Sequence, residues 1–366
     1  MRLFLRLFSV LFAGTMLLLG LAVAGGQRVL TATLIVTSTG DSGAGSLRQA
    51  LADANNGDTI QFDAALNGQT ITLTSAELAI DKNITINGPG PTQLTVERST
   101  AGGVPAFRIF HVMPGHTVMI KGLTVYHGLA SLGGGVSNDH ATLTLDNCTV
   151  TGNGNEYGNG GSGGGIYNNG EQGSATLAIV NSTISNNGSG DGGGIYNNGA
   201  ILTITNSIVT NNAVFISTGG FANLGSGAGV YNTGTLAITN STLSDNRANR
   251  DGGGILNAGP LTITNSTITR NSAGPTEGSG GGIWSSAAVT ITSSTLSHNG
   301  AGASHDGIPL GSGGAIFNSG NLEIVSSTLH DNGTTGYGGG IYSGGTSATL
   351  TIVNSTHSLS YRSGCC

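Results

Sequence analysis

Four ionisable residues whose side chains could move protons stand at one position of a repeated pattern. Each lies two residues after the last aliphatic residue of a short apolar segment: Asp245, Arg270, His298 and Asp331. If the repeats stack about 4.8 Å apart, an acid, a base and an imidazole share one face. A surface ladder explains the same pattern, because Arg270 and His298 separate the two aspartates and avoid like-charge stacking. Spacing within one column does not establish acid–base geometry, so the sequence favours the ladder.

Two further aspartates could form a carboxylate pair. Asp191 and Asp251 both precede a Gly-Gly-Gly-Ile segment, and Ser226 holds this position in the repeat between them. Two repeat steps place the carboxylates about 9 to 10 Å apart, near the upper limit of inverting glycosidases. The sequence has no calcium loop, zinc-type cysteine and histidine spacing or phosphate-binding loop, and its one Gly-x-Ser-x-Gly motif, at residues 160–164, precedes no predicted helix. We therefore expect no metal, no nucleotide, no other cofactor and no serine nucleophile.

A column of large apolar residues is the better candidate for a binding surface. One position after the first aliphatic residue of successive repeats stand Tyr167, Tyr196, Tyr231, Leu256, Trp284, Phe317 and Tyr342. Strand alternation sends the aliphatic residue inward and this residue outward, whereas a soluble β-face is normally polar outside. The column is either a platform for sugar rings or a partner, or it packs on itself or beneath inserted loops. The sequence leaves both interpretations open.

These columns need a regular scaffold, and the repeats predict one. A Gly-Gly-Ile-Tyr-like element recurs at steps of 25 to 35 residues, with its aliphatic residue at Val136, Ile166, Ile195, Val230, Ile255, Ile283, Ile316 and Ile341. Each repeat holds three short segments with period-two alternation and β-branched residues, which indicates three strands. Three strands in about 25 residues fit a coil whose strands pair with their copies in the next turn. The predicted fold is all-β, a right-handed parallel β-helix of about ten coils.

Two asparagine columns support this arrangement. One stands three residues after the third segment's last aliphatic residue, at Asn153, Asn187, Asn212, Asn246, Asn271, Asn299 and Asn332. The other comprises Asn147, Asn181, Asn206, Asn240 and Asn265, then Ser293, Ser326 and Asn354. We expect both columns to bridge turns, because stacked carboxamides hydrogen-bond along the axis and asparagine tolerates the left-handed backbone of a sharp corner.

Composition narrows the class of protein. Glycine makes up 65 of 366 residues, and only 8% of residues are charged. Lysine and arginine number 12 against 18 acidic residues, so no basic stripe is present to neutralise phosphates, and nucleic acid is not an expected partner. Three cysteines, Cys148, Cys365 and Cys366, cannot form a disulfide framework.

The domain organisation is expected to be linear. Residues 1–24 have the charged start, apolar stretch and Ala-Val-Ala site of a signal peptide, although the apolar stretch is long enough for an uncleaved anchor. Residues 25–62 predict a strand–helix–strand cap whose helix begins with a capping box of Ser46 and Gln49. Irregular coils follow over residues 63–130 and regular repeats over residues 131–356. Residues 357–366 are irregular and have the character of a truncated end, or carry cysteines for lipidation or cross-linking.

These motifs resemble known families. Residues 41–62, with Gly-Ser-Leu-Arg at residues 45–48, resemble the N-terminal segment of bacterial surface proteins with a CSLREA-type cap and a right-handed β-helix of the pectin-lyase-like class, although Gly45 replaces the cysteine. The later repeats are similar to those of polymorphic outer membrane proteins. Gly-Gly-Ala-Ile at residues 313–316 matches one signature, and Ile-Ser-Asn-Asn at residues 184–187 matches the other with isoleucine for phenylalanine. The resemblance covers roughly residues 33–356.

The resemblance implies a secreted, cell-surface or outer-membrane protein that binds glycans or other surface ligands without catalysis. It also leaves open a polysaccharide lyase or glycoside hydrolase, in which Asp245, Arg270, His298 and Asp331 would be catalytic, or a structural envelope spacer. A polysaccharide or cell-surface ligand is the expected partner. Membrane contact is expected only through the N-terminal signal or a missing C-terminal anchor.

Overall fold

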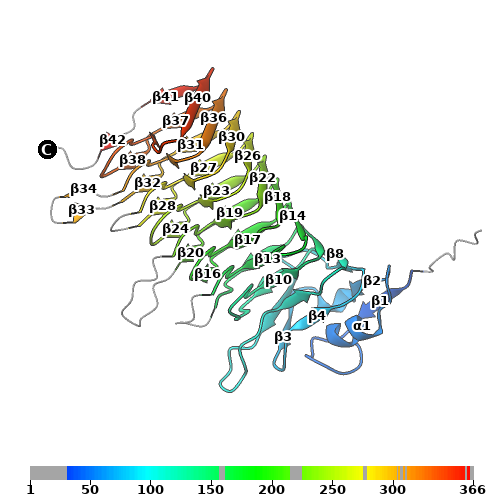
Figure 1. Cartoon of the computed structure of the whole chain (residues 1–366). Coiled ribbons are helices and arrows are strands. Elements are labelled where there is room, and N and C mark those ends of the chain that lie inside the picture. Colours follow the sequence, from blue (N-terminus) through cyan, green and yellow to red (C-terminus); the bar gives the residue numbers. More distant parts are fainter. Residues whose placement is uncertain are drawn as a thin grey trace, which may run out of the picture. The chain divides into compact units, whose positions relative to one another are not determined.

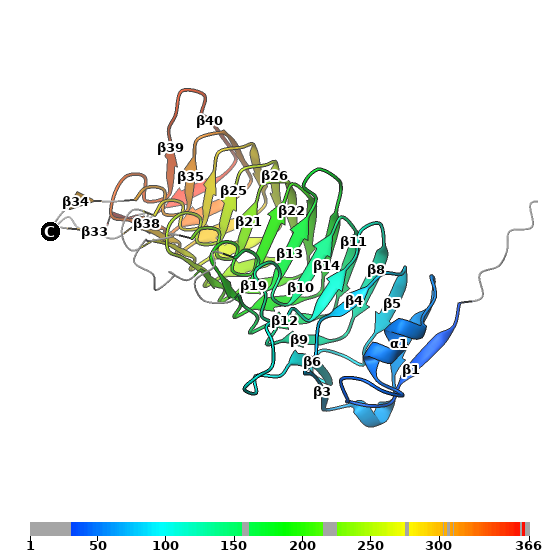
Figure 2. The ribbon, with the colours of Figure 1, turned by 60° about the horizontal axis from the view of Figure 1, so that its bottom comes forward.

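The computed structural model describes residues 31–155, 161–214, 225–274, 278–302, 304–305, 308–309, 311–358 and 361–362. The predicted signal peptide, the start of the Gly-x-Ser-x-Gly motif and the C-terminal cysteines lie outside these residues. Four parallel sheets dominate the described part, and each coil from residue 166 onward adds one strand to each sheet in turn (Figures 1 and 2). The prediction of a parallel β-helix is therefore confirmed.

We name the sheets by the order in which a regular coil enters them. Sheet 1 contains β4 (Leu78–Ile80), β7 (Phe110–Val112), β10 (Val136–Asp139), β13 (Ile166–Asn169), β17 (Ile195–Asn198), β21 (Val230–Asn232), β25 (Ile255–Asn257), β29 (Ile283–Ser285), β35 (Ile316–Asn318) and β39 (Ile341–Ser343). Sheet 2 contains β1 (Thr33–Val36), β2 (Thr59–Phe62), β5 (Ile84–Asn87), β8 (Thr117–Lys121), β11 (Thr142–Asp146), β14 (Thr176–Val180), β18 (Ile201–Thr205), β22 (Thr235–Thr239), β26 (Leu261–Thr264), β30 (Val289–Thr292), β36 (Asn321–Val325) and β40 (Thr349–Val353).

The remaining strands complete the coils. Sheet 3 contains β3 (Gln69–Leu73), β6 (Leu94–Arg98), β9 (Thr124–Tyr126), β12 (Thr149–Thr151), β15 (Thr183–Ser185), β19 (Ile208–Thr210), β23 (Thr242–Ser244), β27 (Thr267–Thr269), β31 (Thr295–Ser297), β37 (Thr328–His330) and β41 (Thr356–Ser358). Sheet 4 contains β16 (Gly188–Ser189), β20 (Ala213–Val214), β24 (Arg247–Ala248), β28 (Ser272–Ala273), β32 (Gly300–Ala301), β38 (Gly333–Thr334) and β42 (Tyr361–Arg362). A small antiparallel pair, β33 (Ser304–His305) and β34 (Ile308–Pro309), lies between β32 and β35.

The fourth sheet was not predicted, because its two-residue strands carry no alternation pattern. The other three sheets follow the predicted segments, and their aliphatic residues form one continuous core. In a typical coil, Ile195, Leu202, Ile204 and Val209 are fully buried. Each pairs in register with an aliphatic residue of the next coil, so the two coils share the same inward pattern. Hydrophobic burial thus sets the register of each sheet.

The N-terminal end of the stack is covered by a short helix. Helix α1 (Leu47–Asp53) follows β1 and packs against β1 and β4 through Leu47, Ala50 and Leu51 (Figure 2). The Ser46 side chain accepts the backbone N–H of Gln49 at 3.1 Å, as a helix N-cap does. The reciprocal half of the predicted capping box is absent, because the Gln49 side chain donates to Asp53 instead.

A 3-10 turn, η1 (Ala64–Leu66), follows β2. Among the described residues, none of the helices is both long and apolar enough to cross a membrane. Within the part of the chain that the structure describes, helical turns occur only in α1 and η1, close to the first coils.

The asparagines of the first column are buried and bridge consecutive coils. The Asn212 carboxamide donates to Asn246 at 3.0 Å and accepts from the carboxamide and backbone N–H of Asn187 at 3.0 and 3.1 Å. The same bonds recur from Asn153 to Asn332. We call these residues, Asn153, Asn187, Asn212, Asn246, Asn271, Asn299 and Asn332, the asparagine ladder.

Our expectation that one residue would provide both the ladder and the left-handed corner is wrong. The ladder residues have no positive φ. The left-handed positions are the second asparagine column, with φ near 50° at Asn181, and the residue that precedes each ladder asparagine, with φ of 55° at Asn211. The second column forms no comparable ladder, since Asn206 reaches Asn181 only at 3.5 Å. Different residues therefore form the hydrogen bonds between coils and the left-handed corners.

Two further buried ladders escaped the sequence analysis. Serines after the second column accept the backbone N–H of the preceding coil, as Ser207 does from Ser182 at 3.0 Å. In sheet 1, the carboxamides of Asn168, Asn197 and Asn232 are linked at 2.7 Å. These contacts satisfy polar groups inside the stack, so each coil is hydrogen-bonded to its neighbours through side chains as well as strands.

Candidate functional site

The four ionisable residues of the repeated position lie in one row at the corner after sheet 3, and we call them the corner row: Asp245, Arg270, His298 and Asp331. They follow β23, β27, β31 and β37, and their φ values lie between 52° and 58°. The next residue in every case is a buried ladder asparagine. The left-handed step between strand and ladder therefore leaves the corner side chains accessible to solvent, with 32% to 59% of their surface exposed.

The first two members of the corner row form an ion pair. The Arg270 Nε donates to Asp245 Oδ1 at 2.7 Å, and Nη2 donates to Oδ2 at 2.9 Å. This two-bond contact lowers the pKa of the Asp245 carboxyl and raises the pKa of Arg270. Both oxygens of Asp245 are occupied and its charge is balanced, so it is poorly placed to act as a general acid or base.

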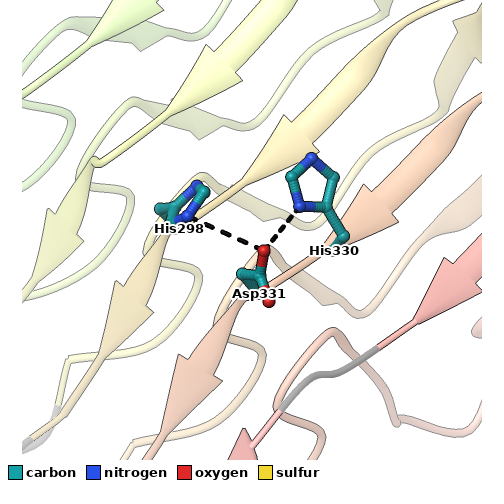
Figure 3. A group of neighbouring side chains, drawn as sticks. All are labelled: His298, His330 and Asp331. Carbon is teal, nitrogen blue, oxygen red and sulfur yellow. Dashed lines mark hydrogen bonds and ion pairs between the residues drawn. The ribbon is translucent and has the colours of Figure 1, made fainter.

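The last two members of the row meet a third residue that the sequence analysis did not select. His330 ends β37 and its Nδ1 lies 2.8 Å from Asp331 Oδ2, while Nε2 of His298 lies 3.7 Å from the same oxygen (Figure 3). The two imidazole rings are edge to face, with centroids 5.5 Å apart. The structure thus gathers two imidazoles and one carboxylate on two adjacent coils.

His330 could have been found from the repeat. Its position is the last residue of the third strand, which elsewhere holds Ser185, Thr210, Ser244 or Ser297. A single histidine in a column of serine and threonine is the signal. Metal-binding motifs are recognised by short sequence spacings, whereas one coil separates His298 from His330 by 32 residues.

The carboxylates of the second predicted pair, Asp191 and Asp251, accept hydrogen bonds from the backbone of the next coil. Asp191 Oδ1 accepts the backbone N–H of Ser226 at 2.9 Å, and Asp251 Oδ1 accepts that of Ser279 at 2.9 Å. The Ser226 hydroxyl in turn accepts the N–H of Asp251 at 3.3 Å, so the three residues belong to one inter-coil row. Burial raises the pKa of both carboxyls. The two aspartates are separated by a full coil that carries Ser226, and they do not contact each other.

The aromatic column lies on sheet 1, and we call it the aromatic stripe: Tyr167, Tyr196, Tyr231, Leu256, Trp284, Phe317 and Tyr342. Its members are direct register partners in neighbouring strands. The rings of Tyr196 and Tyr231 stack with centroids 4.6 Å apart, and Tyr167 stacks on Tyr196 at 5.6 Å. Leu256 interrupts the rings, so the stripe consists of two stacks.

The second stack repeats this geometry. Phe317 lies between Trp284 and Tyr342, with centroid distances of 5.9 and 5.1 Å. Most of the rings are half-buried, whereas Tyr167 and Leu256 are buried. Stacking turns the ring faces toward their neighbours, so ring edges form much of the accessible surface. The rings of the stripe therefore pack on one another and also leave part of their apolar surface accessible to solvent.

Local glycines and polar groups hold the stripe in place. Gly192 and Gly227 have φ near 60°, and a Cβ at either position would lie 3.0 Å from the Cβ of the adjacent stripe tyrosine. The Asn198 carboxamide donates to the Tyr167 hydroxyl at 2.9 Å. Burial raises the pKa of Tyr167, Tyr196 and Tyr231, so these phenols stay neutral at physiological pH.

The fold defines the class of protein, a right-handed parallel β-helix. The family model for the right-handed β-helix region matches residues 214–357, and the parallel sheets extend the same architecture toward the N-terminus. The predicted fold class, including its handedness, is confirmed. Comparison with curated proteins finds no match.

Three solved structures are similar to the chain. Geobacillus virus E2 ORF18 has 12% sequence identity and a TM-score of 0.49, and the match covers 88% of this chain and 60% of that chain. Pectate lyase Pel9A has 14% identity and a TM-score of 0.42, with 90% of this chain and 78% of that chain covered. An alginate lyase from Paenibacillus sp. str. FPU-7 has 14% identity and a TM-score of 0.46, with 89% of this chain and 99% of that chain covered. The chain spans about 60% of the length of the viral protein.

Proposed function

We propose that this protein is a secreted or cell-surface β-helix protein that binds glycans or other surface ligands through the aromatic stripe without cleaving them. The observation that carries this proposal is the pair of outward ring stacks on sheet 1, Tyr167–Tyr196–Tyr231 and Trp284–Phe317–Tyr342. A soluble sheet normally presents polar side chains to water, and a contiguous apolar surface marks a place of contact.

The stripe is suited to a repetitive, weakly charged ligand. Strand pairing fixes each ring relative to the next, so ligand binding would cost little conformational entropy. Accessible ring edges and tyrosine hydroxyls offer apolar contact and hydrogen bonds to a saccharide. A chain molecule lying along the stripe would meet a similar surface on each coil.

The contacts of the candidate acids support a function without catalysis. Arg270 occupies both carboxylate oxygens of Asp245, and the two aspartates of the inter-coil row accept backbone N–H groups. A general acid or base needs a free group within hydrogen-bond reach of its substrate. These side chains instead hold neighbouring coils together.

The proposed location follows from the sequence. Residues 1–24 would direct export, and the cap and repeats resemble those of bacterial surface proteins. We propose that the CSLREA-like cap closes the first coil, since α1 covers β1 and β4 there.

A polysaccharide panel scored for both binding and cleavage tests the proposal. Tyr231→Ala and Trp284→Ala, one in each stack, should weaken binding at least about tenfold, because each removes the stacking surface of its own segment. Tyr126→Ala is the matched control: Tyr126 is a half-buried, stacked aromatic residue on β9 of sheet 3, and its loss should leave binding unchanged.

Stability of the same variants separates binding from packing. Each truncation in the stripe should cost about 1 to 3 kcal/mol, because each ring loses stacking and partial burial. Raising salt should change the affinity little, since ring contacts carry no net charge. Lost stability with unchanged binding would assign the stripe to structure alone and overturn the proposal.

A polysaccharide lyase or hydrolase is the second candidate, and the shared row of Asp245, Arg270, His298 and Asp331 is the observation that favours it. The same panel decides between the two. Depolymerisation by the wild type that disappears in Asp245→Asn and Asp331→Asn would establish catalysis, because asparagine keeps the left-handed corner and removes only the carboxylate.

A further inference from the structure

The geometry points to a metal site at the end of the corner row: we propose that His298, His330 and Asp331 bind a divalent transition-metal ion of the Zn²⁺ type. This inference differs from our sequence-based expectation of no metal, and it does not depend on glycan binding by the stripe. It rests on the juxtaposition of two imidazoles and one carboxylate across two adjacent coils (Figure 3).

The three ligand atoms are close enough to share one ion. One nitrogen of each histidine and one oxygen of Asp331 lie within 4.8 Å of one another. Ligands of a tetrahedral zinc ion with bonds of about 2.0 to 2.1 Å are about 3.3 Å apart. Asp331 Oδ2 lies 2.8 Å from His330 Nδ1 and 3.7 Å from His298 Nε2, so these two distances lie on either side of that value. Small side-chain rotations would bring the three atoms onto one ion without moving the strands.

The backbone beneath the cluster is held firmly. His298 N–H donates to the carbonyl of His330 at 3.3 Å, and β31 pairs with β37 up to His330. Directly after the cluster, Asn299 and Asn332 continue the asparagine ladder at 3.0 Å. The ligand-bearing positions therefore keep their spacing, and binding requires ordering of side chains only.

The donor set selects the type of ion. Imidazole suits Zn²⁺, Co²⁺, Ni²⁺ and Cu²⁺, whereas Ca²⁺ and Mg²⁺ take oxygen ligands. Three protein ligands leave at least one coordination position for water or for a group from another molecule. The exposed His298 side chain, 55% accessible, gives the ion a route from solvent.

The nearest cation of the row does not oppose binding strongly. Arg270 stands one coil before His298, but its guanidinium donates to Asp245 on the far side. That ion pair balances its charge and directs it away from the cluster. Asp331 therefore remains the carboxylate available to the ion.

The chain's own repeats supply variants that preserve the fold. The left-handed corner position is asparagine at Asn186 and Asn211, so His298→Asn and Asp331→Asn retain the backbone conformation. The strand-end position is serine at Ser297, so His330→Ser places a residue that the repeat already accepts. His116→Asn, which removes a histidine from the turn before β8, is the matched control.

The test is calorimetric titration of the metal-free protein, purified without a histidine tag, with Zn²⁺. We expect one equivalent to bind to the wild type and to the control, and affinity to fall at least about tenfold in each of the three cluster variants. Co²⁺ should give absorption bands characteristic of nitrogen and oxygen ligands in the wild type and lose them in His330→Ser. Circular dichroism confirms that the variants are folded.

Two results would overturn the proposal. One is the absence of stoichiometric Zn²⁺ binding to the wild type. The other is an affinity in folded His298→Asn, His330→Ser and Asp331→Asn equal to that of the control. Zn²⁺ should also raise the melting temperature of the wild type and not of the cluster variants, because an ion that binds only the folded coils stabilises them by mass action.

Discussion

The asparagine ladder and the corner row are adjacent in sequence, yet they behave in opposite ways. Ladder residues such as Asn246 and Asn271 are buried and repeat the same bonds from Asn153 to Asn332. The corner residues one position earlier, Asp245 and Arg270, are accessible and differ from coil to coil. The corner residue has a left-handed backbone conformation, and the ladder residue follows it directly. The ladder position is asparagine from Asn153 to Asn332, whereas the residue type at the corner position varies.

The inter-coil row of Asp191, Ser226 and Asp251 is intermediate between these extremes. It bridges coils as the ladder does, but it uses charged residues that are partly buried. Different side chains can therefore form the hydrogen bonds that link neighbouring coils. Burial then decides how costly a charge is at that place.

The largest effect is expected in the ladder. Asn212→Ala should lower the free energy of unfolding by about 3 to 5 kcal/mol, because Asn187 loses the acceptor of two donors and the Ile184 carbonyl loses its donor inside the stack. Chemical denaturation followed by circular dichroism measures the loss. In the same coil, Asn211→Asp keeps the corner and should change stability by less than about 0.5 kcal/mol. Equal losses in both variants would remove the distinction between the two positions.

A smaller effect, with the opposite sign, is expected in the inter-coil row. Asp191→Asn should raise the free energy of unfolding at pH 7, because asparagine can still accept the Ser226 N–H without burying a charge. Burial holds the folded pKa of Asp191 above its unfolded value. The advantage of asparagine is therefore present above the folded pKa and vanishes below the unfolded value of about 3.9. Denaturation at several pH values checks this. An advantage that persists at low pH would mean that charge burial is not its cause.

The smallest effect is expected in the corner row. Arg270→Asn removes the ion pair with Asp245 and should cost no more than about 1 kcal/mol, since both side chains are accessible and screened by water. The pair lowers the folded pKa of Asp245, so its stabilisation is present above the unfolded value of about 3.9 and is lost as the pH falls through the folded pKa. NMR titration of the Asp245 carboxyl should show the pKa rise in Arg270→Asn. An unchanged pKa would show that the ion pair does not form in solution.

Much of this architecture could be predicted because each coil repeats a local rule. Alternation of Leu202, Thr203 and Ile204 places two aliphatic side chains in the core and one residue outside, whatever the rest of the chain does. The shortest step between the first aliphatic residues of successive repeats, such as the 25 residues from Val230 to Ile255, then gives the coil length. Residues that share a phase of the repeat must share a column, which is why the aromatic stripe and the corner row could be identified before their contacts were known.

The contacts within each column could not be predicted in this way. The position of a residue within the repeat does not indicate whether the Arg270 side chain turns toward Asp245 or toward His298, because each of these neighbours is one coil away. It also gives no reason to join His330 to the row, since the two histidines occupy different phases of the repeat. The short strands of sheet 4 were missed because two residues, such as Gly188 and Ser189, hold too little pattern to indicate a strand.

The sequence by itself determined the periodic features of this protein: its coil, its inward aliphatic residues and its columns of asparagine and aromatic residues. These follow from local alternation and from the stacking of identical segments, which depend on residue type and spacing. Only the tertiary structure decided which column members bridge coils, which form corners and which side chains meet. Those outcomes depend on the backbone conformation at each corner and on burial, as the left-handed Asn211 and the buried Asn212 show, and both are set when coils pack on one another.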